Sequence, residues 1–132
     1  MSNEYFEEWT RKAEEDYEAG ITLVRKRKRP TPNAVGFHCQ QCAEKYLKAY
    51  LVLQGVSFPK THDLLELHKI CLSLDPTFEF IGDLLDRLSP YAVEFRYPGE
   101  EVSIEDAKAA VKTMKDVRRF MRRFLMINSQ KE

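Results

Sequence analysis

The sequence predicts an all-α protein, an antiparallel helical bundle of about five helices, three long and two short. Apolar residues recur at steps of three and four, the spacing that places them on one face of an α-helix. The few glycines and prolines, 5 and 6 of 132 residues, cluster between these periodic stretches. With 43% hydrophobic and 32% charged residues, the chain suits one globular domain over residues 1–132.

The first two predicted helices are long. Residues 3–28 form the first, with Asn3 as its N-cap and an apolar stripe along one side: Phe6, Trp9, Ala13, Tyr17, Ile21 and Val24. Acidic residues follow Asn3 and the basic run 25–29 closes this helix, an order that suits the helix dipole. Two prolines then break the chain. Residues 33–54 form the second helix, whose wide apolar face predicts packing on several sides.

Two short helices follow. Residues 62–74 form one of them, and Thr61 is its expected N-cap. The dipeptide Asp75-Pro76 starts the next, over residues 76–88, because Asp is a good N-cap and Pro a good first helical residue.

The last helix is predicted after the longest irregular stretch, residues 89–102; loops of that length in compact domains often carry function. The helix covers residues 103–127 and begins with a weak capping box, Ser103 with Asp106. It carries two apolar lines, which predict packing on the bundle and on a second copy of the chain.

Charge and composition bound the function. The formal net charge is zero, from 21 basic and 21 acidic residues, so binding of nucleic acid by bulk charge is not expected. Basic clusters at residues 25–29 and 112–123 are either solvated helix faces or a local phosphate-binding surface. We expect a cytoplasmic protein with reduced thiols, because the sequence shows no signal peptide, no apolar run of membrane-spanning length and an odd number of cysteines.

Two spacings could supply zinc ligands, Cys39-x-x-Cys42 and His68-x-x-Cys71. Each pair falls inside a predicted helix, on or beside its apolar stripe, whereas structural zinc usually takes such a pair from a turn. The cysteines are therefore predicted to be small core residues. Since no Gly-rich phosphate loop or hydrolase motif is present either, we expect neither a metal nor a cofactor.

The stretch from Phe37 to Ala49, FHCQQCAEKYLKA, resembles the second-helix signature of HEPN domains. In that family an aromatic-His-x-Gln-Gln run leads into Ala-Glu-Lys-x-Leu-Lys-Ala. Four more landmarks occur in the expected order: Trp9 with Ala13 and Asp16, Thr61-His-Asp-Leu64 after Gly55, Arg96-Tyr97-Pro98, and Ala107. The resemblance covers about residues 5–126 and implies an up-and-down four-helix-bundle type of fold, usually in a homodimer.

The resemblance also implies possible activities. Many HEPN proteins work beside a small nucleotidyltransferase, often in toxin–antitoxin or defence modules, and many others are ribonucleases. The ribonucleases carry Arg, four to six further residues and then His, because the attacking 2′-hydroxyl needs a base and the phosphate needs a cation. Here Glu101, Val102 and Ser103 occupy the histidine positions after Arg96, and the motif is absent from the whole sequence, which argues against RNA cleavage.

Candidate ligand-binding residues come from three segments: His38, Gln41 and Lys45 on one face of the second helix, His62 and Asp63 at the start of the third, and Arg96 and Tyr97 before the last. Their side chains suit a phosphate or nucleotide better than a metal. Each of the three main candidates also has a structural interpretation. His38 could bond to Gln41 or a neighbouring helix, His62 to backbone, and Arg96 could be a loop anchor paired with a carboxylate: Glu94, Glu100 or Asp63.

Three functional hypotheses follow. The first is a non-catalytic, homodimeric HEPN module that binds a nucleotide, RNA or a nucleotidyltransferase partner through the polar face of the second helix and the loop 89–102. The second is a divergent, metal-independent endoribonuclease of toxin type, with His38 or His62 as base and Arg96 beside the phosphate. The third is a purely structural assembly module. The enzyme requires an imidazole near the Arg96 guanidinium, within one chain or across a dimer.

Overall fold

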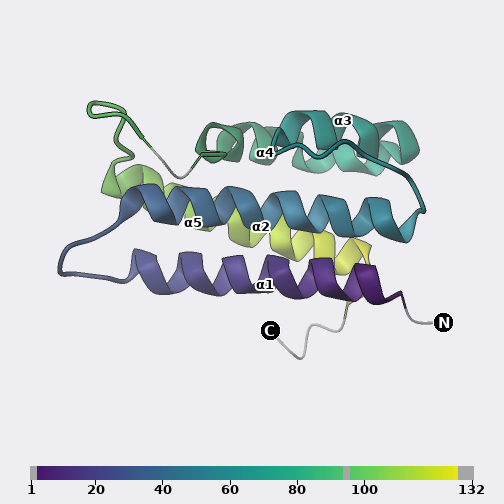
Figure 1. The fold of residues 1–132 in the computed structure, drawn as a ribbon, viewed down its shortest axis with the longest axis horizontal. Helices are drawn as coiled ribbons and strands as arrows, with labels where there is room; N and C mark the ends of the chain where they lie inside the picture. Colours follow the sequence, from purple (N-terminus) through teal and green to yellow (C-terminus); the bar gives the residue numbers. More distant parts are fainter. Residues whose placement is uncertain (1–2, 94–95, 128–132) are drawn as a thin grey trace.

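Three long helices lie side by side, and two short ones cover one of them (Figure 1). The computed structural model describes residues 3–93 and 96–127, and that part of the chain contains helices and no strands. The elements are α1 (Glu4–Val24), α2 (Pro32–Leu53), α3 (Leu64–Leu74), η1 (Pro76–Ile81), α4 (Gly82–Leu88), η2 (Ser89–Tyr91) and α5 (Ile104–Phe124), where η denotes a 3₁₀ helix. The predicted bundle of three long and two short helices is confirmed. None of the described helices is both long enough and apolar enough to cross a membrane.

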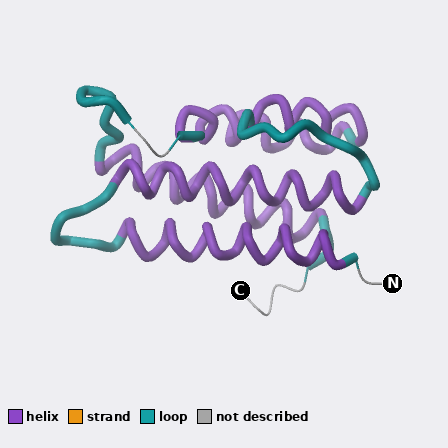
Figure 2. The backbone as a smooth tube through the Cα atoms, viewed as in Figure 1, coloured by secondary structure: helices purple, strands orange, loops and turns teal. Residues whose placement is uncertain are grey.

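The central element is α2. It packs against α1, α5, α3, α4 and η2, and 14 of its 22 residues are buried. This explains the wide apolar face seen in the sequence. Most connections lie at the ends of the bundle, but the segment 54–63 runs back along it before α3 begins (Figure 2).

Most helix starts follow the predicted capping chemistry. Side-chain oxygens of Asn3 and Ser103 accept hydrogen bonds of 3.0 Å from the amides of Phe6 and Asp106, respectively. Asp75 accepts one of 2.9 Å from the Thr77 amide. The predicted helix 76–88 is divided into η1 and α4, and the irregular stretch 89–102 contains the short η2.

Two predicted helix ends are wrong. The first helix ends at Val24 rather than at residue 28, so the basic run belongs to the loop between α1 and α2. Arg29 in that loop has a φ of 49°, which is incompatible with continuing a right-handed helix. The N-cap of α3 is Asp63 rather than Thr61, because the Asp63 carboxylate accepts hydrogen bonds from the first-turn amides of the helix.

The apolar lines of α5 are mostly used within the chain. In the first line, Met114 and Met121 are fully buried. In the second, Ala110 is 4% exposed and Val117 is 1% exposed. The second line is therefore packed within the chain over its first part. Its last members lie partly exposed in an aromatic cluster with Tyr50 and Phe78: they are Phe120 and Phe124.

Two helical glycines test this packing. A Cβ added at Gly36 would lie 2.9 Å from Cδ1 of the Tyr91 ring, whereas one added at Gly20 would meet the flexible tip of Met114 at 3.2 Å. We expect Gly36→Ala to lower the free energy of unfolding by about 1–2 kcal/mol, because the clash outweighs the gain in helix propensity. Gly20→Ala is the matched control and should be neutral or slightly stabilising. If urea denaturation gives both variants the same stability, the close approach of η2 to α2 is contradicted.

Candidate functional site

The polar line on α2 first meets a buried carboxylate of α1. His38 Nδ1 lies 2.8 Å from Asp16 Oδ1, and Lys45 Nζ lies 2.5 Å from Asp16 Oδ2. Asp16 is only 7% exposed. These contacts join α1 to α2, and they agree with the structural interpretation of His38 as a residue bonded to a neighbouring helix.

Asp16 is one of the family landmarks in the sequence, but the sequence pattern predicts no role for it. The available signal was its position, three residues after Ala13 on the apolar stripe of α1. A carboxylate at such a position needs a partner, because burial of an unpaired charge is costly. The partner could not be read from α1 alone, since it lies on another helix.

A second carboxylate, Glu44, collects the rest of the polar line. Glu44 is 1% exposed, and Lys48 Nζ lies 2.9 Å from one of its oxygens. His62 Nδ1 lies 3.2 Å from both oxygens. The side-chain amides of Gln40 and Gln41 each donate to the carboxylate at 3.3 Å. This buried charge is therefore both paired and hydrogen-bonded, as stable burial requires.

The Glu44 cluster joins three helices. The Gln40 side chain also donates to the backbone carbonyl of His62 at 3.1 Å, which fixes the chain just before α3. On the other side, Lys48 Nζ lies 5.3 Å from the centre of the Trp9 ring on α1, a cation–π distance. The His62 side chain itself remains 72% exposed. Asp63, its predicted neighbour in the ligand site, caps α3 instead.

A third cluster joins α1, α2 and α5 around Glu14. Arg118 holds this carboxylate with two hydrogen bonds of 2.7 and 2.8 Å, and the Tyr46 hydroxyl donates to it as well. Arg122 Nη1 lies 3.7 Å away. Burial alone would raise the pKa of the Glu14 carboxyl, but the hydrogen bonds from Arg118 and Tyr46 outweigh it and hold the pKa below its ordinary value. No pattern in the sequence predicted this cluster, because its members come from three helices far apart in the chain.

Arg96 is anchored to the backbone near η2. Its Nη2 donates to the Pro90 carbonyl at 2.7 Å, and the guanidinium carbon lies 5.8 Å from the centre of the Tyr91 ring. Arg96 is thus a loop anchor, as one interpretation of the sequence predicted. Its partners are a backbone carbonyl and an aromatic ring rather than a carboxylate. Tyr97, the other candidate in this loop, is 67% exposed.

The carboxylates proposed as partners of Arg96 have other roles. Glu100 accepts a hydrogen bond of 3.2 Å from the Tyr97 amide. Asp63 accepts from the first amides of α3. Glu94 lies outside the described residues.

The candidate residues thus make three separate sets of contacts within one chain: with Asp16, with Glu44 and with the backbone near η2. Tyr91, whose ring lies beside the Arg96 guanidinium, packs on Gly36, and the directions of Gly36 and His38 are about 160° apart around the axis of α2. Glu44, which holds His62, is about 12 Å further along that axis than Gly36. In the described part of the chain no hydrogen bond joins Arg96 to either histidine. The contacts described above therefore do not bring Arg96 and a histidine together within one chain.

The cysteines are core residues, as predicted. All three are buried, and burial raises the pKa of the Cys39 and Cys71 thiols to about 12. His68 is buried too, with Nε2 2.7 Å from the Phe78 carbonyl oxygen. Among residues 3–93 and 96–127, no three His, Cys, Asp or Glu side chains are grouped so that they could hold a metal ion.

Comparisons with known proteins agree with this architecture. The model of the HEPN domain family matches residues 6–124. A protein of Methanocaldococcus jannaschii named "Putative toxin MJ1304" is 30% identical over 137 aligned positions, which cover 92% of this chain and 88% of that protein. The crystal structure of ST0689, an archaeal HEPN homologue, superimposes with a TM-score of 0.64 at 21% identity, over 92% of this chain and 97% of the other. The likeness to ST0689 concerns the fold alone.

Glu14→Gln tests the third cluster because it removes the charge and keeps the shape. We expect it to lower the free energy of unfolding by about 2 kcal/mol near neutral pH, since the buried Arg118 guanidinium loses its charged partner. The pKa of Glu14 is lower in the folded protein than the ordinary 4.5. Its stabilisation is therefore complete above that value and is lost as the pH falls towards the folded-state pKa, so the difference from the wild type should shrink in acid.

The neighbouring Glu15 supplies the control. Its side chain is 68% exposed and pairs only with the exposed Arg11 at 3.6 Å. Glu15→Gln should change the free energy of unfolding by less than about 0.5 kcal/mol. Equal stability of the two variants in urea denaturation near neutral pH would contradict the role assigned to Glu14.

Proposed function

Because the chain belongs to the HEPN family, we propose that it is a non-catalytic, homodimeric binding module that engages a nucleotide, RNA or a nucleotidyltransferase partner. The observation that carries this proposal is the separation of Arg96 from the histidines. Its guanidinium is bonded to the Pro90 carbonyl, while His38 and His62 are bonded to carboxylates elsewhere. General-base cleavage of RNA needs a base and a cation at the same phosphate.

The placement of the polar landmarks supports the same proposal. Asp16, Glu44 and Lys48 are buried. Asp16 is paired with His38, and Glu44 is paired with Lys48. Charges engaged in this way would have to give up their partners before they could bind a ligand, at a cost of several kcal/mol for a buried pair. Their role in this chain is to brace the bundle.

The biological setting is part of the proposal. The relative from Methanocaldococcus jannaschii is named "Putative toxin MJ1304". From this name we propose that the present chain belongs to a toxin–antitoxin pair. A small nucleotidyltransferase would be the partner that the family resemblance implies. We further propose that residues 1–132 act as a single domain in the cytoplasm.

One observation favours a second candidate, a toxin-like ribonuclease. Glu44 is buried and holds Nδ1 of the largely exposed His62 ring, which leaves Nε2 directed away from the bundle. A carboxylate that orients an imidazole is a common arrangement for a general base. Arg96 of a second copy would then have to approach His62 across the dimer.

A cleavage assay in the presence of a metal chelator separates the two candidates. We expect the purified protein to cut RNA no faster than its Arg96→Ala and His62→Ala variants, because base and cation do not meet. Lys60→Ala is the control, since Lys60 is exposed and lies close to His62 in the chain. Cleavage by the wild type that is lost in either site variant and kept in Lys60→Ala would overturn the proposal in favour of the ribonuclease. Light scattering on the same sample should give the mass of a dimer, and a monomer would contradict the homodimer.

A further inference from the structure

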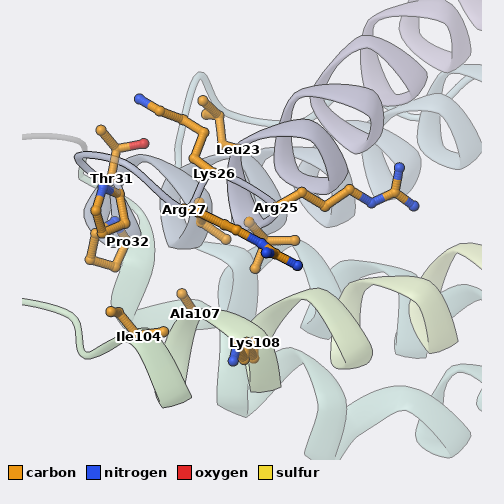
Figure 3. Close-up of a pocket in the computed structure, with 12 residues that line it drawn as sticks. Leu23, Arg25, Lys26, Arg27, Thr31, Pro32, Ile104, Ala107 and Lys108 are labelled. Atoms are coloured by element: carbon orange, nitrogen blue, oxygen red, sulfur yellow. The ribbon is translucent and has the colours of Figure 1, made fainter.

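A pocket of about 370 Å³ lies where the loop between α1 and α2 passes the start of α5 (Figure 3). Its walls come from the end of α1, the first turn of α2 and the first turns of α5. Twelve residues line it; four are basic and none is acidic. The basic ones are Arg25, Lys26, Arg27 and Lys108. Three of these belong to the basic run that the sequence had placed on a helix.

None of the four basic side chains is engaged by a carboxylate of the described residues, and Figure 3 shows Arg27 over the space between the loop and α5, whereas Arg25 and Lys26 extend away from it. No ion pair within the described part of the chain involves any of them, although the bundle contains several ion pairs elsewhere. Glu105 and Asp106 belong to the first turn of α5, but neither lines the pocket. Positive charge is therefore concentrated here in a chain whose net charge is zero.

Thr31 adds a polar group that is missing a partner. It lies at the N-cap of α2 and lines the pocket, yet its side chain makes no capping hydrogen bond. Its hydroxyl oxygen is buried and has no hydrogen-bond partner among the described residues. Buried polar atoms are nearly always satisfied, so this hydroxyl has unused hydrogen-bonding capacity at the edge of the pocket.

The start of α2 at the pocket also favours an anion. The first backbone N–H groups of an α-helix have no partner inside the helix, and the Thr31 side chain does not cap those of α2. The start of α5 reaches the same pocket through Ile104 and Ala107. The uncapped start of α2 therefore directs the positive end of its dipole towards this cavity, an arrangement that favours phosphate groups, whereas the start of α5 is already capped by Ser103.

We propose that this pocket binds a phosphate ester with an attached apolar or aromatic group. The phosphate would lie between Arg27, Lys108 and the Thr31 hydroxyl. The organic group would lie on the apolar wall, formed by residues that include Leu23 and Val24. The volume is in the range of small-molecule sites. The inference rests on the proposed binding function and assigns it to a site other than the polar face of α2.

The same chemistry could come from a free nucleotide or from the 5′-phosphate at the end of an RNA. Titration calorimetry with the full chain distinguishes these sources by comparing AMP, adenosine, inorganic phosphate and one RNA oligonucleotide with and without its 5′-phosphate. We expect AMP to bind at least about tenfold more tightly than adenosine, because charged hydrogen bonds to phosphate dominate. A preference for AMP over the 5′-phosphorylated RNA identifies the nucleotide, and the reverse identifies the RNA end.

Site variants locate the binding. Arg27→Ala and Lys108→Ala should each weaken binding of the phosphorylated probe by roughly tenfold, and Thr31→Val by a smaller factor. Two matched controls carry the same charge outside the pocket. Lys28 is the next residue in the loop, and Lys115 lies two turns beyond Lys108 on the same face of α5. Lys28→Ala and Lys115→Ala should change the affinity by less than about twofold, apart from a weak general effect of charge.

Two results would overturn the inference. In one, the control variants weaken binding as much as the pocket variants do, which would show attraction by bulk charge. In the other, no phosphorylated probe binds at millimolar concentration. RNA binding that the pocket variants leave unchanged would overturn the pocket and keep the proposed function. RNA cleavage by the wild type would overturn the proposed function. The pocket would still be decided by the affinities of the Arg27→Ala, Lys108→Ala and Thr31→Val variants.

Discussion

The carboxylate of Glu44, buried in the middle of α2, is the group around which the polar side chains between α1, α2 and α3 are arranged. An unpaired charge at this depth would cost more than the net stability of a typical domain, so donors must surround it. They come from α2 itself and from His62 at the entry to α3. Lys48 then contacts Trp9 of α1. One buried charge thus fixes how three helices meet.

Sequence patterns predicted what is local. The helices, three of the caps and the buried cysteines follow from apolar spacing and from side chains that bond within three residues of themselves. The end of α1 was missed because the basic run suits both a helix terminus and a loop. The carboxylate partners were missed because they are distant: Asp16 is 22 residues from His38, and Glu14 is 104 residues from Arg118. The family landmarks identified several of these positions but not what each one contacts.

Two sets of charges differ in how they are engaged, and this division underlies the functional account. Those on the inner face of α2 are paired with Asp16 and Glu44. By contrast, Arg25, Lys26 and Arg27 of the loop between α1 and α2 line a pocket without an ion pair to any described residue. Unpaired charges beside a cavity can bind an anion without breaking an existing interaction. We therefore assign the polar face of α2 a role in stabilising the bundle, and the basic run 25–29 a role in binding the ligand.

A double-mutant cycle on Asp16 and Lys45 tests this division most directly, with phosphate-ester binding measured on the same variants. The account predicts a coupling of about 1–3 kcal/mol in the free energy of unfolding, as expected for a buried, hydrogen-bonded pair between two helices. It also predicts that Lys45→Ala, where it remains folded, binds the phosphate ester within about twofold of the wild type, since Lys45 does not line the pocket. A coupling below about 0.3 kcal/mol, together with loss of ligand binding in Lys45→Ala, would contradict it.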